Sequence, residues 1–445
     1  MTAYWVRFAE LPDGLAERVR LTVAGGRFDA VEIGVDAAPA DVRLDGVVLP
    51  GFANAHSHAF HRALRGRTHG DGGTFWTWRE QMYATASRLD PDGYFALARA
   101  VYAEMVSAGM TAVGEFHYLH HDHGGRRYAD PNAMNDALVA AAAEAGIRLT
   151  LLDVCYLSGG LTATGHLPLD PVQERFSDGS VDDWAERVAG WSSPPGVVVG
   201  AAVHSVRAVP EKDLTRFAEV VSGLRGGGGP VHVHLSEQPA ENAAVQAFYG
   251  CTPTALLARN GLLDERTSAV HATHLSEDDI AALGSARTYA CFCPTTERDL
   301  ADGIGPAHAL AAAGSPLTLG SDQHAVIDMF EELRGLELHE RLISNERGRF
   351  TPAELIAAAT ETGHRSLGRP DAGRLEAGAL ADFVEVSGDS VRTVGSRPDQ
   401  IVYSATAADV RTVVVGGEVV VRAGEHRLGP VATLLAESLP TLEER

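Results

Sequence analysis

Five polar residues at the ends of apolar segments have the side-chain types of a transition-metal site. His56 and His58 stand two positions apart at the end of the first segment, and alternate residues of a strand project to the same side. His234, His271 and Asp322 end three later segments. Any one of them is more often an ordinary strand-end residue, but five at successive strand ends favour a shared site. Three imidazoles and one carboxylate suit a divalent transition metal that keeps room for water.

Glu237 follows His234 by three residues, just beyond the end of the same segment. A carboxylate in that place can reach a metal-bound water and carry protons, and a metal-dependent hydrolase needs such a group. The alternative is a surface glutamate at the start of a helix. We favour the proton shuttle.

These residues meet only if the segments that carry them are strands of one barrel. Eight apolar, β-rich segments recur, at residues 46–54, 111–117, 149–156, 197–204, 230–235, 268–274, 287–293 and 316–321. Stretches with a helical pattern separate most of them, at 135–145, 211–224, 240–260, 276–283 and 306–313. Strands alternating with helices are typical of the α/β class, and eight of them predict a closed (β/α)8 barrel. The candidate ligands would then converge at its mouth.

The two ends of the chain follow a different pattern. They carry short β-type segments, at 4–8, 18–23, 382–386 and 411–421. We expect one small β-sandwich-like domain from residues 1–47 and 375–445, with a C-terminal helical tail, beside a barrel of residues 48–374. Two long loops, at 65–81 and 158–175, follow the first and third barrel strands, at the end of the barrel where active sites are built.

The composition argues against several classes of protein. The chain has 37 basic and 59 acidic residues, and its net charge of −22 argues against binding to nucleic acid or to an anionic membrane. Lys212 is the only lysine, so a P-loop is excluded and a Schiff-base lysine is disfavoured. No signal-peptide pattern opens the chain, no apolar run reaches the roughly 18 residues of a membrane span, and four cysteines are too few for a disulfide scaffold. We therefore expect a cytoplasmic protein.

Several short motifs resemble those of the amidohydrolase superfamily, and most closely those of the formimidoylglutamate deiminases. They are Asn-Ala-His-Ser-His-Ala-Phe-His-Arg-Ala at 54–63, Trp-Arg-Glu-Gln-Met-Tyr at 78–83, Gly-Glu-Phe-His-Tyr-Leu-His-His at 114–121, His-Ser-Val-Arg-Ala-Val at 204–209, His-Leu-Ser-Glu-Gln at 234–238, His-Ala-Thr-His at 271–274 and Gly-Ser-Asp-Gln-His at 320–324. The likeness extends from about Gly51 to beyond Asp322. The metal and shuttle motifs indicate only the superfamily, whereas Phe-His-Tyr and His-Ser-Val-Arg indicate the narrower family.

The resemblance implies a zinc-dependent enzyme of histidine degradation, which hydrolyses N-formimino-L-glutamate to N-formyl-L-glutamate and ammonia. It implies one zinc ion per chain, with the ligands His56, His58, His234 and Asp322. It implies catalytic roles for Glu237, His271 and Asp322, and substrate binding by Arg79, Tyr118, His204 and Arg207. We also expect a homodimer, and a small anionic substrate as the binding partner.

The type of substrate agrees with the residues themselves. Arg207 and Arg79 would lie near strand ends, and a guanidinium fork matches a carboxylate, although either could instead form an ordinary ion pair. His61 departs from the family, which commonly has glutamine there. Because histidine can also donate a hydrogen bond, we keep His61 in the substrate-binding set, and the substrate class is unchanged. The departure weakens the choice of glutamate over a shorter or modified analogue.

Other functions stay open. A related deaminase or chlorohydrolase acting on a nucleobase-like ring would share the metal residues, but it would give no reason for the arginine, histidine and tyrosine set. A different formimino amino acid, such as formimino-aspartate, would fit that set equally well. A binuclear hydrolase commonly needs a carboxylated lysine on the fourth strand, whereas Lys212 lies in an expected helix. A non-enzymatic relative need not keep the full ligand set.

Overall fold

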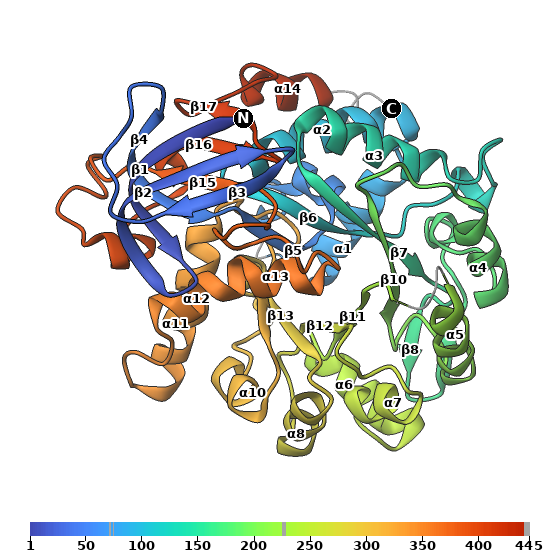
Figure 1. Cartoon of the computed structure of the whole chain (residues 1–445). Coiled ribbons are helices and arrows are strands. Elements are labelled where there is room, and N and C mark those ends of the chain that lie inside the picture. The colour runs from blue at the N-terminus through green and yellow to red at the C-terminus, as the bar shows by residue number, and fades with distance from the viewer. Residues whose placement is uncertain (71–72, 74, 225–227, 440–445) are drawn as a thin grey trace.

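The computed structural model describes residues 1–70, 73, 75–224 and 228–439. Residues 71, 72 and 74 of the first expected loop, and residues 440–445 of the expected C-terminal tail, lie outside the described residues. An eight-stranded parallel barrel forms the larger part of the fold, and strands from the two ends of the chain form a mixed sheet beside it (Figure 1).

The barrel strands hydrogen-bond in the order β5-β6-β7-β10-β11-β12-β13-β14. They are β5 (Phe52–Ser57), β6 (Met110–His117), β7 (Arg148–Cys155), β10 (Val198–Ser205), β11 (Val231–Leu235), β12 (Thr267–His271), β13 (Tyr289–Phe292) and β14 (Leu317–Leu319). All pairings along this order are parallel. The ring nearly closes where Ser57 pairs with Asp322, just beyond β14. The predicted (β/α)8 barrel is therefore confirmed.

One expected strand spans two elements. Residues 46–50 belong to β4 (Val42–Pro50) of the mixed sheet, and β5 begins only at Phe52. Gly51 separates them, and a Cβ at this position would lie 2.3 Å from Thr111 Oγ1. The chain thus passes from one sheet to the other at a residue that has no room for a side chain, a constraint that depends on a distant neighbour.

Helices follow most barrel strands and lie around the outside of the barrel (Figure 1). They are α1 (Phe75–Ala86), α2 (Pro91–Ser107), α3 (Ala133–Ala145), α4 (Val181–Gly190), α5 (Glu211–Gly223), α6 (Pro239–Tyr249), α7 (Pro253–Arg259), α8 (Glu277–Ser285), α9 (Pro294–Asp299), α10 (Ala307–Ala313), α11 (Met329–Ser344), α12 (Pro352–Ala359) and α13 (Glu361–Ser366). The expected single helix at 240–260 is wrong, because α6 and α7 divide it. Gly250 ends α6 with a φ of 71°, and Thr252 caps α7 ahead of Pro253.

The mixed sheet has the strand order β18-β17-β16-β15-β4-β1-β2-β3. Besides β4 it contains β1 (Thr2–Leu11), β2 (Gly14–Ala24), β3 (Arg27–Glu32), β15 (Phe383–Val386), β16 (Val410–Val415), β17 (Glu418–Arg422) and β18 (Glu425–His426), and α14 (Val431–Ser438) follows it. The parallel pair β1–β4 and the antiparallel pair β4–β15 join the two ends of the chain. The sandwich-like form and the boundaries at residues 47 and 375 stay predictions.

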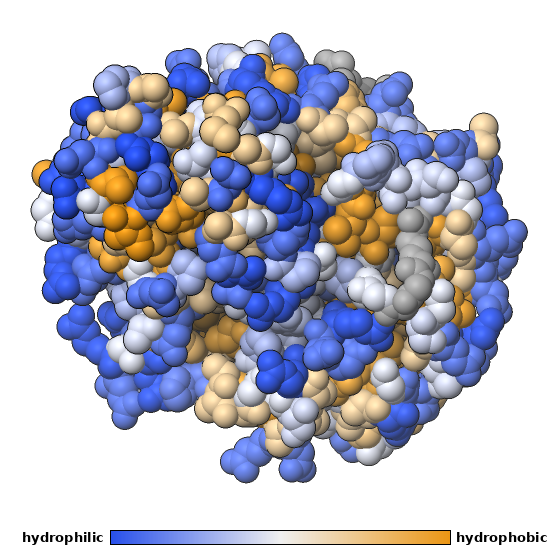
Figure 2. Space-filling model, viewed as in Figure 1, coloured by the Kyte–Doolittle hydropathy of each residue, from blue (hydrophilic) through white to orange (hydrophobic). Residues whose placement is uncertain are grey.

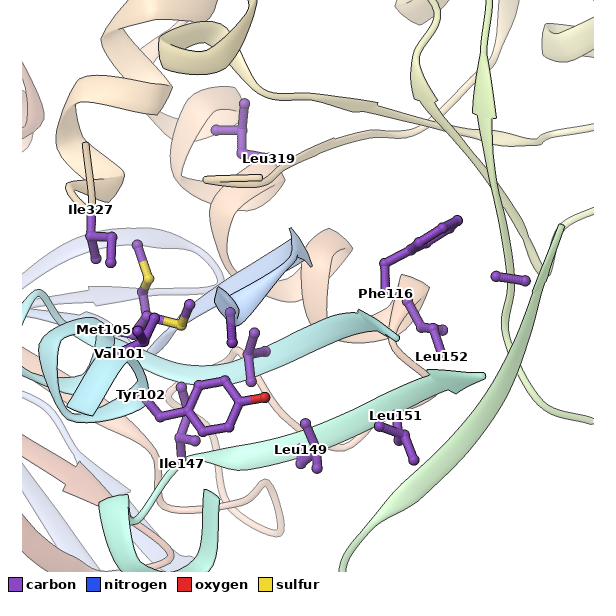
Figure 3. Packing of buried hydrophobic residues seen from close by; sticks show 14 of the residues in the cluster. Val101, Tyr102, Met105, Phe116, Ile147, Leu149, Leu151, Leu152, Leu319 and Ile327 are labelled. Carbon is purple, nitrogen blue, oxygen red and sulfur yellow. The ribbon is translucent and has the colours of Figure 1, made fainter. Parts of the chain in front are cut away.

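Close packing fixes the barrel strands. β6 is buried along its whole length and β7 along all but its first residue, as expected for parallel strands covered on both faces. Figure 3 shows Tyr102 of α2 beside Ile147, the residue before β7, and one hydrophobic cluster includes both together with Val101, Met105 and Leu149. The face seen in Figure 2 is largely hydrophilic, with apolar residues gathered in small areas. No helix of the described residues is long and apolar enough to cross a membrane.

A buried ion-pair cluster supports the segment that follows β6. Arg187 Nη2 lies 2.7 Å from Asp153 Oδ1, and Arg187 Nε lies 2.9 Å from Asp178 Oδ1. His121 Nε2 lies 3.1 Å from Asp178 Oδ1, so the cluster reaches the chain just beyond Tyr118. Burial alone would raise the pKa of Asp153, but Arg187 holds it below its ordinary value.

We expect Asp153→Ala to lower the free energy of unfolding by roughly 3–5 kcal/mol, because it leaves a buried cation with one partner fewer. The pKa of Asp153 is depressed in the folded state. The stabilisation is therefore complete above the unfolded-state pKa of about 3.9, and it declines as the pH falls from there toward the lower folded-state pKa. Urea denaturation at pH 7 and at pH 3 measures both effects. The exposed pair of Asp182 with Arg216 provides the control: an equal loss in Asp182→Ala would contradict the prediction.

Candidate metal centre and active site

Four side chains meet at the carboxyl ends of the barrel strands. His56 and His58 come from the end of β5, His234 from β11, and Asp322 follows β14. His234 Nε2 lies 3.1 Å from His56 Nε2 and 3.4 Å from His58 Nε2. Asp322 Oδ1 lies 3.3 Å from the Nε2 atoms of His56 and His58. All four side chains are buried, with one ligand atom from each inside a small common space. The structure therefore forms a candidate metal site from the four residues expected to hold a metal.

The outer nitrogens of two of these imidazoles are fixed by the backbone. His58 Nδ1 donates to the carbonyl of Phe116 at 2.9 Å, and His234 Nδ1 donates to the carbonyl of His204 at 2.9 Å. These bonds leave each Nε2 with a lone pair that faces the common centre. Burial lowers the pKa of His58 to about 3 and also lowers the pKa of His234. The imidazoles are therefore neutral, the form that binds a metal, and the donor set fits a transition metal such as zinc.

We expect purified protein to carry one divalent transition-metal ion per chain, since one group of four donors converges on one point. Elemental analysis by mass spectrometry measures this stoichiometry. His234→Ala removes a ligand and should lose most of the metal, whereas His123→Ala, at an exposed position, should keep it. Two ions per chain, or full activity without any, would contradict this expectation.

His271 and Glu237 stand beside the four ligands. His271 Nε2 lies 3.7 Å from Glu237 Oε1 and 4.0 Å from Asp322 Oδ2, and His271 Nδ1 lies 3.5 Å from Glu297 Oε1. Burial alone would lower the pKa of His271, but the carboxylates of Glu237, Asp322 and Glu297 raise it well above its ordinary value. These carboxylates therefore favour the protonated imidazole of His271, next to a carboxylate that can move a proton.

The backbone around these residues is strained. Ser236, His271, Ala272 and Asp322 have positive φ angles of 51°, 70°, 49° and 42°, a conformation that side chains other than glycine rarely adopt. Such strain persists where the surrounding structure fixes it, and it gathers at active sites. It indicates that the positions of the imidazole and carboxylate groups are preorganised.

The expected substrate-binding residues line one cavity of about 300 Å³ together with the metal ligands His58, His234 and Asp322. They are His61, Arg79, Tyr118, His204 and Arg207. The ring of His61 lies 4.5 Å from that of His58, and His61 Nε2 shares a hydrogen bond of 2.8 Å with the hydroxyl of Tyr118. The structure thus brings the whole expected set to one cavity, and the individual roles stay predictions.

Several residues of this cavity were missed in the sequence. Glu241, in the first turn of α6, has a wholly buried side chain in the cavity wall, and its place four residues after Glu237 was the available signal. Gln173 is buried behind the wall, where Nε2 donates to the hydroxyls of Tyr83 and Tyr156 at 2.8 Å each. Arg79 Nε donates to the same Tyr83 hydroxyl at 2.6 Å, so Gln173 helps to position an arginine of the expected set. Nothing in the sequence distinguishes Gln173 from other loop residues.

The hairpin of β8 (Gly160–Thr162) and β9 (Gly165–Leu167) contributes further wall residues from the second expected loop. His166 Nδ1 of this hairpin donates to the carbonyl of Arg207 at 3.1 Å, and its Nε2 shares a hydrogen bond of 2.7 Å with the hydroxyl of Tyr249. The hairpin is therefore tied to the segment after β10 and to α6.

Comparison with known proteins identifies the family. A model of the amidohydrolase family matches residues 47–420. The chain belongs to the amidohydrolase family. A second model, for the N-terminal domain of formimidoylglutamate deiminase HutF, matches residues 1–45, so both the barrel and the first strands of the mixed sheet have counterparts. The family expected from the motifs is confirmed.

Three similar proteins agree with this membership. The chain is 38% identical to the formimidoylglutamate deiminase of Pseudomonas aeruginosa over 444 residues, 96% of each protein. A crystal structure of an amidohydrolase from Brucella melitensis has a TM-score of 0.89 at 34% identity, over 100% of both chains. An adenosine deaminase from Xanthomonas campestris with bound zinc has a TM-score of 0.83 at 26% identity, over 99% of this chain and 98% of that one.

Proposed function

We propose that the protein is a formimidoylglutamate deiminase, which hydrolyses N-formimino-L-glutamate to N-formyl-L-glutamate and ammonia with one zinc ion per chain. The observation that carries this proposal is the composition of the cavity: a candidate metal site, a carboxylate beside it and two arginines line one space. The similarity to the Pseudomonas aeruginosa enzyme over 96% of both chains supports it. The zinc bound by the Xanthomonas campestris relative supports the choice of metal.

One group of residues acts on the formimino end of the substrate, and another group binds its carboxylates. A zinc ion held by the four ligands supplies Lewis-acid chemistry, which makes water a competent nucleophile near neutral pH. Asp322 accepts the proton released as water adds to the formimino carbon. Glu237 delivers a proton to the nitrogen that leaves as ammonia, and protonated His271 stabilises the attacked group by hydrogen bonding.

At the other end, Arg207 and Arg79 orient the substrate through its carboxylates, together with Tyr118, His204 and His61. An arginine fork gives both charge and direction to such a contact. A formamidine is cationic at neutral pH, so its placement beside Glu237 and Asp322 is favourable, while the carboxylates are directed to the arginines. This arrangement leaves the amino acid attached and releases ammonia.

The experiment that tests the proposal is ammonia release by metal-loaded protein from a small panel of compounds. The panel contains N-formimino-L-glutamate, N-formimino-L-aspartate, an uncharged N-alkylformamidine and adenosine, because the Xanthomonas campestris relative is an adenosine deaminase. The highest kcat/KM is expected for N-formimino-L-glutamate. A preference for adenosine would overturn the proposal, and a preference for the aspartate analogue would correct its substrate. The homodimer and the cytoplasmic location stay predictions.

A further inference from the structure

Arg207 lies between two carboxylates, only one of which has a role in the proposed reaction. Its Nη2 lies 3.6 Å from Glu237 Oε2, and its Nε lies 3.3 Å from Glu241 Oε2. Glu241 belongs to the first turn of α6, Glu237 precedes that helix by two residues, and Arg207 follows β10. Arg207, which we expect to bind a substrate carboxylate, therefore already faces the carboxylate of Glu241 in the cavity wall.

Burial of the Glu241 carboxylate carries a large desolvation cost. Its side chain is 0% exposed, against 9% for that of Glu237 and 19% for that of Arg207. Burial raises the pKa of Glu241, and the facing Arg207 opposes that change. A hydrophobic residue of similar volume would avoid the desolvation cost of this acid, so the pairing of Glu241 with Arg207 is not explained by stability alone.

The contacts of Arg207 indicate a use for this pairing. Its backbone carbonyl is held by Ser158 Oγ at 3.0 Å and by His166 Nδ1 at 3.1 Å, so the main chain is fixed and only the long side chain can change direction. Without Glu241, the nearest acid to the guanidinium is Glu237. A buried cation moves toward its nearest anion, because the interaction strengthens steeply as water is excluded. Arg207 would then close onto the carboxylate that must move a proton.

We infer that Glu241 is a positioning residue that attracts the Nε side of Arg207, limits the approach of the guanidinium to Glu237 and keeps it in place for a substrate carboxylate. The inference rests on the proposed function. The two ion pairs involve Nε and Nη2 and include no hydrogen bond at Nε, and the Nη1 end of the guanidinium faces neither glutamate and is left for the substrate. Glu241 thus acts on the reaction only through Arg207, which separates its role from that of Glu237.

A double-mutant cycle with Arg207 tests this role. We expect Glu241→Gln to lower kcat/KM for N-formimino-L-glutamate by about 10- to 100-fold, the size of effect produced by a misplaced positioning group. In the Arg207→Leu background the same substitution should change kcat/KM by no more than about threefold, because residues that act through one contact are not additive. Glu241→Asp keeps the charge and should recover part of the loss. Metal content and melting temperature are measured for each variant, so that kinetic constants refer to folded, metal-loaded protein.

Glu277→Gln is the matched control, since Glu277 is an exposed glutamate in the first turn of α8 and should leave the kinetics unchanged. Wild-type-like kinetics of Glu241→Gln would overturn the inference, and so would an equal loss in both backgrounds. The inference would also be overturned if Glu241→Gln lowered only the melting temperature or the metal content, while kcat and KM of the metal-loaded fraction stayed normal. If wild-type protein releases no ammonia from N-formimino-L-glutamate, the proposed function itself fails, which is a different result from an active wild type with an active Glu241→Gln variant.

Discussion

Glu237→Gln is expected to lower kcat by about 100- to 10,000-fold, the usual contribution of a general acid–base group. Glutamine has nearly the same shape, so it keeps the contact with the cavity, but an amide neither accepts nor delivers the proton. The position of Glu237, 3.7 Å from His271 Nε2 and just beyond the strand that carries His234, places it beside the reacting groups. Steady-state kinetics with N-formimino-L-glutamate measures the effect.

Metal analysis provides the control for this variant, because Glu237 is not among the four converging ligands and the metal should be retained. KM should change little compared with kcat, since the amide still fills the same space. A loss well below tenfold with normal metal content would mean that another group moves the proton, and Asp322 would then be the first alternative.

Arg207→Leu is expected to lower kcat/KM for N-formimino-L-glutamate about 30- to several-thousand-fold. This range corresponds to the roughly 2–5 kcal/mol lost when one partner of a buried charge pair is removed, at about 1.4 kcal/mol per tenfold change.

The discriminating measurement for Arg207→Leu is the ratio of kcat/KM between N-formimino-L-glutamate and an uncharged N-alkylformamidine. The ratio should narrow, because the preference for the anionic substrate depends on the carboxylate contact. The metal should be retained. If the variant keeps its metal and still prefers the anionic substrate as strongly as wild type, Arg207 does not bind a carboxylate. The substrate assignment would then rest on family membership alone.

The sequence is informative where a signal is local. The alternation of β-rich and helical segments predicts the barrel, and the place of His56, His58, His234 and Asp322 at strand ends predicts that they meet. Local signals can also be overlooked. Gly250 ends α6 and Pro253 begins α7, and both residue types are common at such helix ends.

Other features depend on neighbours that are distant in sequence. Gly51, between the two sheets, has no room for a side chain because Thr111 of β6 crowds it, and Glu241 faces Arg207 because α6 packs beside the segment after β10. Glu241 lies in the first turn of α6, but the face of this helix that meets the cavity is set by packing. Gln173 belongs to the same class, since its partners Tyr83 and Tyr156 come from α1 and the end of β7.

Product analysis by mass spectrometry tests the central claim most directly, because it identifies the bond that breaks. Metal-loaded protein incubated with N-formimino-L-glutamate should yield N-formyl-L-glutamate and one ammonia for each substrate consumed, and it should yield neither product after removal of the metal. Formation of L-glutamate and formamide instead would show cleavage at the other carbon–nitrogen bond and would contradict a deiminase. Absence of turnover by fully metal-loaded protein would contradict the proposed function altogether.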